Sequence, residues 1–202
     1  MCCRYLFDDS TLEEVWKVVN DVDQKIHWQA GDIHPSDHAL VLTGHPNNRE
    51  KNGLRAQEMK WGLDLSYSSQ LIINARSETV LAKASFSQAV SKSRCLIPAR
   101  QFYEWDSDKN KVTFSLEKEN TMYMAGFYLP YHDIDRFTIL TTAANDSMKP
   151  VHDRMPLILA ADQIQDWIFD NEKVAWYLSQ PSPHLHRFQE FQQLSFFDLF
   201  HQ

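Results

Sequence analysis

The sequence predicts an α+β fold with a mainly antiparallel sheet. Short strand-like segments are numerous and few helical patterns lie between them, so the regular alternation that builds a doubly wound parallel sheet is missing. Aromatic residues make up 12% of the chain and only 5 residues are glycine, which is typical of a folded protein with a sizeable core. The length of 202 residues suits one domain, although it also allows two small ones.

The first expected elements are a strand and a helix. The strand-like segment CCRYLF covers residues 2–7. Ser10 and Glu13 then form a capping-box pattern, which predicts that a helix begins there. The helix is expected to be amphipathic, because apolar residues recur at helical spacing at Leu12, Val15, Trp16 and Val19.

Short strands follow along most of the remaining chain. They are expected at residues 38–43, 54–63, 93–99, 101–105, 111–117, 121–129, 136–143 and 155–160. A turn-rich segment at 44–53 joins the first two, and helical patterns cover 78–92 and 161–179. The segment QPSPHLH at 180–186 predicts a boundary, so we expect one domain at 1–180 and an aromatic C-terminal tail at 181–202.

Composition and charge exclude several classes of protein. No apolar segment approaches the ~18 residues that span a bilayer and the start of the chain does not resemble a signal peptide, so we expect a cytoplasmic protein without a membrane partner. The three cysteines, Cys2, Cys3 and Cys95, lack a CxxC spacing, which argues against a disulfide framework and a zinc site; no metal or cofactor is expected. The net charge of −7 argues against a protein that coats phosphates over its whole surface, but it is compatible with a local basic groove.

The opening MCCRY places a cysteine directly after the first methionine. Removal of Met1 would give Cys2 a free α-amine, with a reference pKa of about 7.7 to 8.0, beside a thiol that titrates near ~8.5. An aldehyde that meets this pair can form an imine with the nitrogen and then close a five-membered thiazolidine with the sulfur. The alternative, which this segment alone favours, is a small residue in a frayed chain end.

Three further segments place reactive side chains beside apolar, strand-like residues. In LIINARSET, Asn74 ends an apolar strand, where an amide is costly unless it is hydrogen-bonded. In CLIPARQFYEWD, Glu104 lies between two aromatic residues, a setting that can raise the pKa of a carboxylate toward neutrality. In VHDRMPLIL, His152 precedes a strand. Each residue also has a structural explanation: Asn74 could cap a helix, Glu104 could pair with a surface lysine and His152 could lie in a solvated turn. Together with Cys2 they supply a nucleophile, an acid, a base and an orienting amide.

These segments resemble the motifs of the SRAP family, the SOS-response-associated peptidase domain of abasic site processing proteins. The family motifs MCGR, NAR-x-E-T, CL-x-P-x-x-x-FYEW and IHDRMP correspond to MCCR, NARSET, CLIPARQFYEW and VHDRMP, in the same order over residues 1 to about 160. The resemblance implies a single SRAP domain in which a strongly twisted, mainly antiparallel sheet forms a pseudo-barrel with peripheral helices. Cys3 departs from the pattern, because the family usually has glycine there.

The resemblance also implies a function. Proteins of this family sense abasic sites in single-stranded DNA and form a covalent thiazolidine cross-link through the N-terminal cysteine, which protects the lesion. Carried over to this chain, Cys2 is the nucleophile after removal of Met1, Asn74 orients it, and Glu104 and His152 shuttle protons. Because an imine also acidifies the adjacent C2′ position, weak lyase activity is expected as a side reaction.

The expected DNA contacts are arginine and aromatic residues near these motifs. A guanidinium matches the geometry of a phosphate, and an aromatic ring that stacks on a base contributes ~1 to 3 kcal/mol. The phosphate candidates are Arg4, Arg76 and Arg154, and the stacking candidates are Trp105, Trp61 and Tyr67. Trp61 also fits a core residue, because WGLDLSYSS lacks the Pro and Trp that commonly follow WG in the family.

Two other function classes remain as alternatives. A cysteine-dependent peptidase or amidohydrolase would use the same Cys2, Glu104 and His152, but it would need an oxyanion hole and a peptide groove. A DNA-binding module without chemistry would leave Cys2 and Glu104 without a role. The arginines near the reactive residues favour DNA, so we expect a nucleoid-associated monomer whose partner is single-stranded DNA with an abasic site.

The tail suggests a second partner. Gln193, Leu194, Ser195, Phe196 and Phe197 resemble the short clamp-binding peptide of bacterial replication proteins, in which apolar anchors enter a preformed pocket. The alternative, which we favour, is that Phe191, Leu194, Phe197 and Phe200 pack at helical spacing on the protein's own surface. Titration of a peptide of residues 188–202 against a bacterial sliding clamp distinguishes the two.

Overall fold

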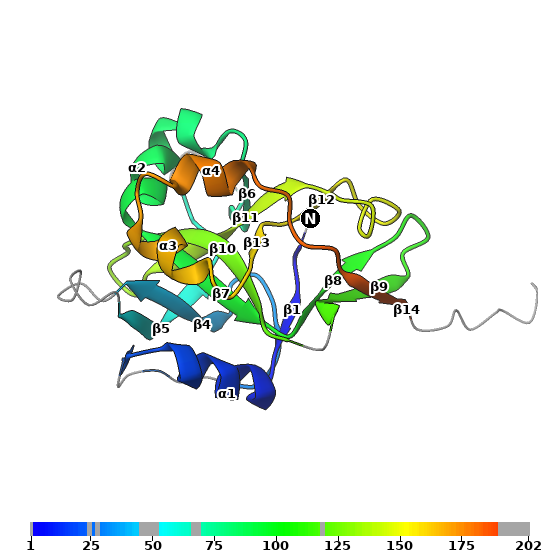
Figure 1. Ribbon diagram of the computed structural model, residues 1–202, viewed down its shortest axis with the longest axis horizontal. Coiled ribbons are helices and arrows are strands. Elements are labelled where there is room, and N and C mark those ends of the chain that lie inside the picture. Colours follow the sequence, from blue (N-terminus) through cyan, green and yellow to red (C-terminus); the bar gives the residue numbers. More distant parts are fainter. Residues whose placement is uncertain are drawn as a thin grey trace, which may run out of the picture.

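The computed structural model describes residues 2–23, 26, 29–44, 53–65, 70–117 and 120–189. Over these residues the strands form two sheets, and the helices lie around the larger one (Figure 1). Most of these strand pairs are antiparallel, and the parallel pairs lie in the larger sheet. The fold is therefore a mixed α+β fold rich in antiparallel pairing, as the sequence predicts.

The larger sheet follows the path β12–β11–β10–β7–β4–β5–β2, with β13 beside β10 and β6 beside β11. Its strands are β2 (Asp21–Val22), β4 (His38–Gly44), β5 (Leu54–Trp61), β6 (Asn74–Arg76), β7 (Arg94–Ala99), β10 (Met122–Leu129), β11 (Arg136–Ala143), β12 (Arg154–Pro156) and β13 (Ile158–Leu159). An additional pairing of β11 with β5 returns the path on itself, so the sheet is partly ring-like.

The expected pseudo-barrel is met only in part. The ring closes through a short parallel pairing in which Arg136 lies opposite Lys60 and Phe137 opposite Trp61, and β4 meets β7 at the single pair Leu42–Leu96. Such short joints make a twisted, partly closed sheet and not a clean barrel.

The smaller sheet holds the N-terminal strand. Its order is β14–β9–β8–β1–β3 and its pairs are antiparallel. The strands are β1 (Tyr5–Phe7), β3 (Gly31–Ile33), β8 (Gln101–Trp105), β9 (Lys111–Ser115) and β14 (His186–Gln189). Because β14 pairs with β9, the folded body extends past the boundary expected at residue 180, and only the part of the tail beyond residue 189 lies outside the described residues.

The first helix begins two residues earlier than the capping box predicts. Helix α1 spans Asp9–Val18, and its N-cap is Asp8 and not Ser10. The Asp8 carboxylate accepts a hydrogen bond from the Thr11 backbone N–H at 2.8 Å and from the Ser10 and Thr11 hydroxyls at 2.7 Å each. A carboxylate satisfies the free N–H groups of the first turn and also suits the positive end of the helix dipole, so it displaces the serine from this role.

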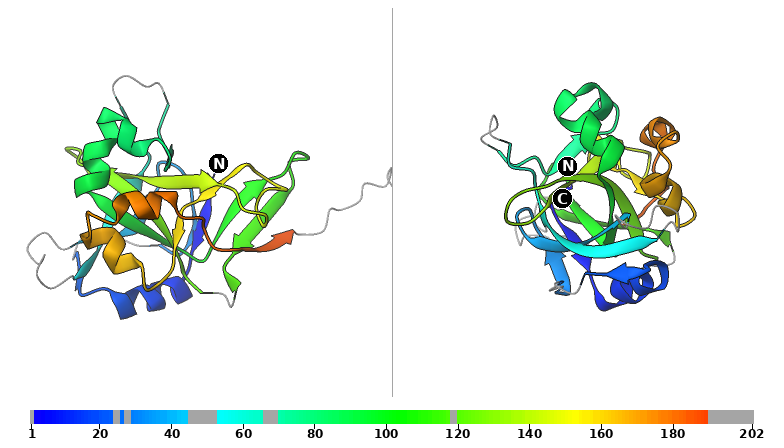
Figure 2. Two further views of the ribbon diagram at one scale, coloured as in Figure 1. Left: turned by 45° about the horizontal axis from the view of Figure 1, so that its top comes forward. Right: turned by 90° about the vertical axis from the view of Figure 1, so that its left-hand side faces the viewer.

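Two long helical patterns break into shorter pieces. Residues 78–92 form a 3₁₀ turn (η2, Val80–Ala82) and α2 (Ala84–Lys92), and residues 161–179 form α3 (Ile164–Phe169) and α4 (Val174–Ser179). Between α3 and α4 the Asp170 carboxylate accepts the backbone N–H groups of Glu172 and Lys173, which makes a local turn that competes with the helix. Figure 2 shows these helices and α1 at the periphery of the strands in the end-on view.

The core lies between the sheets and the helices. Its largest fully buried side chains include Trp61, Trp167, Tyr5, Phe102, Phe114, Phe127 and Phe137. At Gly126 in β10 the packing leaves no room for a side chain, because a Cβ there would lie 2.6 Å from the Thr138 carbonyl oxygen and 2.6 Å from Ile97 Cδ1. The glycine therefore permits the close approach of β10 to its neighbours.

One continuous segment joins the two sheets and positions the site. β7 is buried along its whole length in the larger sheet, and after Arg100 the chain enters β8 of the smaller sheet. The Arg100 N–H donates to the Leu6 carbonyl at 2.8 Å, which aligns β8 with β1. The passage of CLIPARQFYEW from one sheet to the other therefore brings Glu104 beside the N-terminal residues.

Candidate functional site

Cys2 is held at the edge of β6. Asn74 is the first residue of this strand, which runs parallel to β11 with Asn74 opposite Ile139. The Asn74 side-chain amide Nδ2 donates to the Cys2 carbonyl oxygen at 2.8 Å. The structure thus brings together two of the predicted site residues that are 72 positions apart in the chain.

Glu104 lies near Cys2 because its strand, β8, pairs with β1. Tyr5 is opposite Phe102, and the Tyr103 N–H donates to the Arg4 carbonyl at 3.0 Å, so the pairing continues toward the N-terminus. Both Cys2 and Glu104 are almost fully buried, with 1% and 4% of their surfaces exposed.

The environment of Cys2 favours the neutral thiol. Burial raises the pKa of the Cys2 thiol far above its usual range, and the negative charge of Glu104 raises it further. The same two causes raise the pKa of the half-buried Cys3. A nucleophile in this setting reacts only when a nearby group takes its proton, and Glu104 is a carboxylate close enough to act on it electrostatically.

His152 lies in the loop that joins the C-terminal end of β11 to β12. Its backbone N–H donates to the Met148 carbonyl at 3.0 Å, and its ring Nδ1 lies 2.9 Å from both the Arg154 backbone nitrogen and Asp153 Oδ1. The side chain is 28% exposed. β6 and β12 flank β11 on its two sides, with Thr141 opposite both Arg76 and Pro156, so the NAR and HDR segments converge on one end of β11.

The three predicted phosphate contacts differ in their surroundings. Arg4 donates through Nε to Asp32 Oδ2 at 2.9 Å and lies over the Tyr103 ring. Arg154 forms a two-pronged ion pair with Glu78, at 2.7 and 2.8 Å. Arg76, at the end of β6, is exposed. Arg76 is therefore the most accessible of the three, and the other two already bind carboxylates.

The stacking candidates have different outcomes. Trp61 cannot stack on a base, because its side chain is fully buried, its indole N–H donates to the Ile73 carbonyl at 3.0 Å and its ring stacks on Phe137. Trp105 ends β8 and is half-buried. Tyr67 lies outside the described residues, as do the tail residues Gln193, Leu194, Phe196 and Phe197.

Sequence reasoning missed the acidic partners of the arginines. Glu78 belongs to the NARSET segment, where its position two residues after Arg76 was a usable signal. Asp32 in β3 had no such signal, because β3 itself was not expected. Over the part of the chain that the structure describes, no group of three or more His, Cys, Asp or Glu side chains could hold a metal ion. None of the helices described is long and apolar enough to cross a membrane.

Comparison with known proteins decides the family. The family model described as SOS response associated peptidase (SRAP) matches residues 1–193. The chain belongs to the SRAP family. Among its relatives, the abasic site processing protein YoaM of Bacillus subtilis is 32% identical over 166 residues, which are 73% of this chain and 71% of the relative. The abasic site processing protein YedK of Escherichia coli is 23% identical over 83% of this chain and 79% of its own length.

Solved structures share the fold of this chain. A crystal structure of a protein from Bordetella bronchiseptica superposes with a TM-score of 0.77 at 21% identity, over 94% of this chain and 100% of that one. A second, from Bacteroides thetaiotaomicron, gives a TM-score of 0.75 at 18% identity, over 95% and 93% of the two chains.

Proposed function

We propose that this SRAP protein processes abasic sites in single-stranded DNA by covalent attachment through Cys2, once Met1 has been removed. The names of the relatives support abasic site processing. The observation that carries the covalent mechanism is the position of Cys2, whose carbonyl is held by Asn74 and whose thiol lies in the electrostatic field of a buried Glu104.

The proposed reaction has two bond-forming steps. The Cys2 α-amine attacks the C1′ aldehyde of the ring-opened deoxyribose, and loss of one water gives an imine. The Cys2 sulfur then bonds to C1′, the thiol proton ends on the ring nitrogen, and a thiazolidine results. The product therefore has the mass of protein plus DNA minus one water.

Each of the other site residues has a role in these steps. Asn74 fixes the Cys2 backbone through its carbonyl, which orients amine and thiol toward one carbon. Glu104, while ionised, stabilises the positive charge of the protonated imine; as the sulfur adds and that charge disappears, Glu104 takes up the thiol proton in exchange for the proton that the ring nitrogen keeps. His152 moves protons to and from the sugar oxygen during ring opening. Abstraction of a C2′ proton from the imine would give the β-elimination expected as a weak lyase activity.

DNA binding is proposed to depend on few contacts. Arg4, Arg76 and Arg154 hold phosphates and Trp105 stacks on a base beside the lesion. Because few phosphates are neutralised, the dependence of affinity on salt should be shallow, with a slope of about 0.7 per phosphate contact for a single strand. This would reconcile DNA binding with the net charge of −7 and with a cytoplasmic, nucleoid-associated monomer.

The test is the intact mass of the purified protein before and after incubation with a single-stranded oligonucleotide that carries one abasic site. We expect loss of Met1 and a heat-stable adduct of protein plus DNA minus one water, formed by wild type and Cys3→Ser but not by Cys2→Ser. A protein that lacks Met1 and forms no adduct would contradict the cross-linking mechanism and favour the peptidase alternative.

A further inference from the structure

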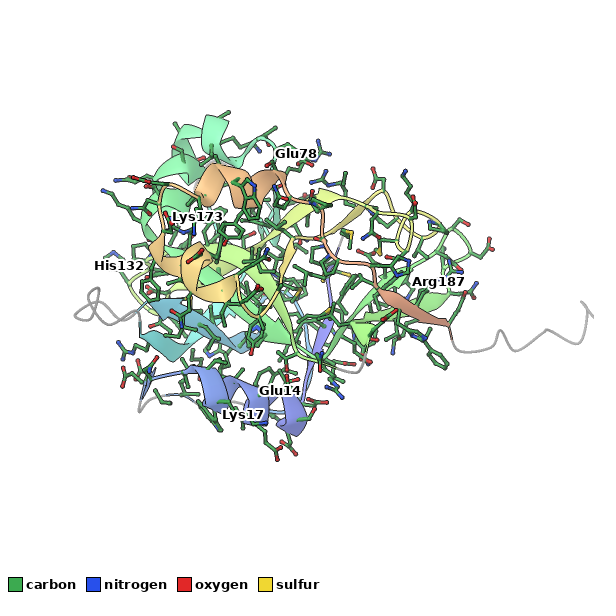
Figure 3. All side chains as sticks on the ribbon, in the orientation of Figure 1. Glu14, Lys17, Glu78, His132, Lys173 and Arg187 are labelled. Carbon is green, nitrogen blue, oxygen red and sulfur yellow. The ribbon has the colours of Figure 1, made fainter. Side chains whose placement is uncertain are left out.

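The Glu78 carboxylate binds the guanidinium of Arg154, which is the group proposed to bind a phosphate. Its two carboxylate oxygens accept hydrogen bonds from Arg154 Nη1 and Nη2 at 2.7 and 2.8 Å. This end-on, two-pronged geometry is the one by which arginine binds a phosphate. Figure 3 shows Glu78 near the edge of the molecule on the side of β6.

The donor count of Arg154 shows that a phosphate and Glu78 cannot both bind in this way. A guanidinium has five N–H groups. Glu78 takes one from each Nη, and the Thr141 carbonyl takes a further one from Nη2 at 2.6 Å. Two N–H groups remain, the second one on Nη1 and the one on Nε, and the Nε group is buried. These two lie on opposite sides of the guanidinium and do not form a fork. No pair of adjacent N–H groups is left at the surface, so a phosphate that binds the fork must replace Glu78.

The difference in burial shows which partner moves. The Arg154 side chain is 13% exposed, and the backbone carbonyl of Thr141 anchors it. The Glu78 side chain is 45% exposed and regains its full hydration when it swings into water, so its departure costs on the order of 1 kcal/mol, the upper end for a surface ion pair. Arg154 therefore stays in place while Glu78 leaves.

A second arginine lies near the same carboxylate. Arg76 precedes Glu78 by two residues, and it contributes with Arg154 to lowering the pKa of Glu78. The Glu78 carboxylate therefore lies within the electrostatic field of Arg76 and Arg154, which both lie near the end of β11. Its hydrogen bonds go to Arg154, so the competition with a phosphate concerns that guanidinium.

We propose that Glu78 is a phosphate surrogate that competes with DNA for Arg154 and so weakens the binding of undamaged single strands. The inference rests on the proposed function, because it takes the DNA backbone as the ligand. The noncovalent complex is kept weak, and stable attachment is left to the covalent bond that only an abasic site can form.

The experiment measures the affinity of undamaged single-stranded DNA for the full chain by fluorescence anisotropy at one fixed salt concentration. Glu78→Gln should bind up to about fivefold more tightly, the amount by which an exposed ion pair can oppose binding. Glu78→Asp keeps the charge but shortens the side chain, so it should also bind more tightly. Glu13→Gln, which removes an exposed charge from α1, is the matched control and should bind as wild type does.

The same substitution in a protein that lacks Arg154 distinguishes competition for this guanidinium from general repulsion between Glu78 and DNA. In Arg154→Gln the gain from Glu78→Gln should vanish, because there is no guanidinium left to release. The inference is wrong if Glu78→Gln binds equally or more weakly, which would make Glu78 a residue that positions Arg154, or if the gain persists without Arg154. Melting temperatures identify a variant that fails to fold, in which case Glu78→Asp carries the test. A wild-type protein that binds no single-stranded DNA would overturn the inference together with the DNA-binding part of the proposed function, whereas the mass experiment tests the covalent step separately.

Discussion

At the scale of single residues, the geometry of the N-terminus depends on hydrogen bonds from distant parts of the chain. The Cys2 carbonyl has the Asn74 amide as donor, and the Cys2 thiol lies near the Arg4 carbonyl, with 3.9 Å between sulfur and oxygen. A terminal residue would otherwise be among the least ordered in a domain. The Asn74 bond therefore contributes to the orientation of Cys2, the proposed nucleophile.

Replacement of Asn74 by aspartate should slow cross-linking. The carboxylate of Asn74→Asp has the same shape, but it cannot donate to the Cys2 carbonyl and repels it instead. Loss of a hydrogen bond worth about 1.5 kcal/mol predicts a rate lower by about tenfold. The rate is measured as adduct formed over time on a denaturing gel.

The matched control for this prediction is Asn20→Asp. The Asn20 Oδ1 accepts the Leu54 N–H at 3.2 Å, and a carboxylate keeps that role. This variant should cross-link at the wild-type rate. Equal rates for Asn74→Asp and wild type would show that the amide does not orient Cys2.

The sequence predicted which motif residues lie close together better than it predicted their partners. Cys2, Asn74 and Glu104 come together as expected, because each belongs to a motif beside a strand. The ion pair between Arg154 and Glu78 depends on the placement of β6 and β12 on opposite sides of β11, which is a tertiary feature. The burial of Trp61 depends on the joint between β5 and β11, which no local pattern reveals.

At the scale of elements, one buried arginine joins two helices to the central sheet. Arg94 at the start of β7 donates to the carbonyls of Val90 and Ser91 at the end of α2, and to those of Trp167 and Ile168 in α3. It also donates to Asn171 Oδ1 at 2.8 Å. A cation at the C-terminal ends of helices satisfies free carbonyls and suits the helix dipole. Burial lowers the pKa of Arg94 to about 10, so the group remains charged at neutral pH.

Replacement of Arg94 by methionine should destabilise the fold. Arg94→Met keeps much of the apolar volume but leaves several buried carbonyls without a donor, which should cost about 3 kcal/mol. The free energy of unfolding from urea titration measures the loss. Arg187→Met, at an exposed arginine in β14, is the control and should change it by less than about 0.5 kcal/mol. A small effect at Arg94 would mean that water reaches these carbonyls.

A second connection between elements supports the loop that carries His152. Asn145 donates through Nδ2 to the carbonyls of Ser182 and Pro183 at 3.0 and 2.9 Å, and Ser147 Oγ accepts the Leu185 N–H at 3.1 Å. The loop is thus tied to the chain that precedes β14. The sequence predicts a domain boundary in the segment 180–186, because Pro and Ser are typical of a linker. These residue types do not reveal the hydrogen bonds that join the segment to the loop.

Loss of this connection should slow cross-linking more than it weakens DNA binding. In Asn145→Ala the loop loses two hydrogen bonds to the carbonyls of Ser182 and Pro183 and the acceptor of the Ser147 N–H, so His152 is held less firmly and the proton transfer proposed for it becomes less efficient. We expect a rate lower by about tenfold or less, with little change in the affinity for undamaged DNA. Gln163→Ala removes a hydrogen bond between a side chain and the backbone away from this loop, from the Ala160 N–H just before α3, and should leave the rate unchanged. An unchanged rate in Asn145→Ala would separate the loop from catalysis.

At the scale of the whole molecule, several acidic protons are enclosed by the fold. The Cys2 and Cys95 thiols and the Tyr5 hydroxyl are buried, and burial raises the pKa of each well above its usual value. Cys95 lies in β7 at the centre of the larger sheet, whereas Cys2 belongs to the site. The packing that buries these groups therefore also makes the stability of the protein sensitive to alkaline pH.

The free energy of unfolding should fall as the pH rises above about 8.5, the ordinary pKa of a thiol. Above that pH the unfolded chain releases its thiol protons while the folded chain retains them, so the folded state loses about 1.4 kcal/mol per pH unit for each buried thiol. Below that pH both states are protonated and the contribution is constant. Urea titrations between about pH 7 and pH 10 measure the slope, in a range that largely precedes the titration of lysine. Cys95→Ala should make the slope shallower by about the contribution of one buried thiol, whatever the substitution does to stability at neutral pH. If the slope is unchanged in this variant, Cys95 ionises within the fold.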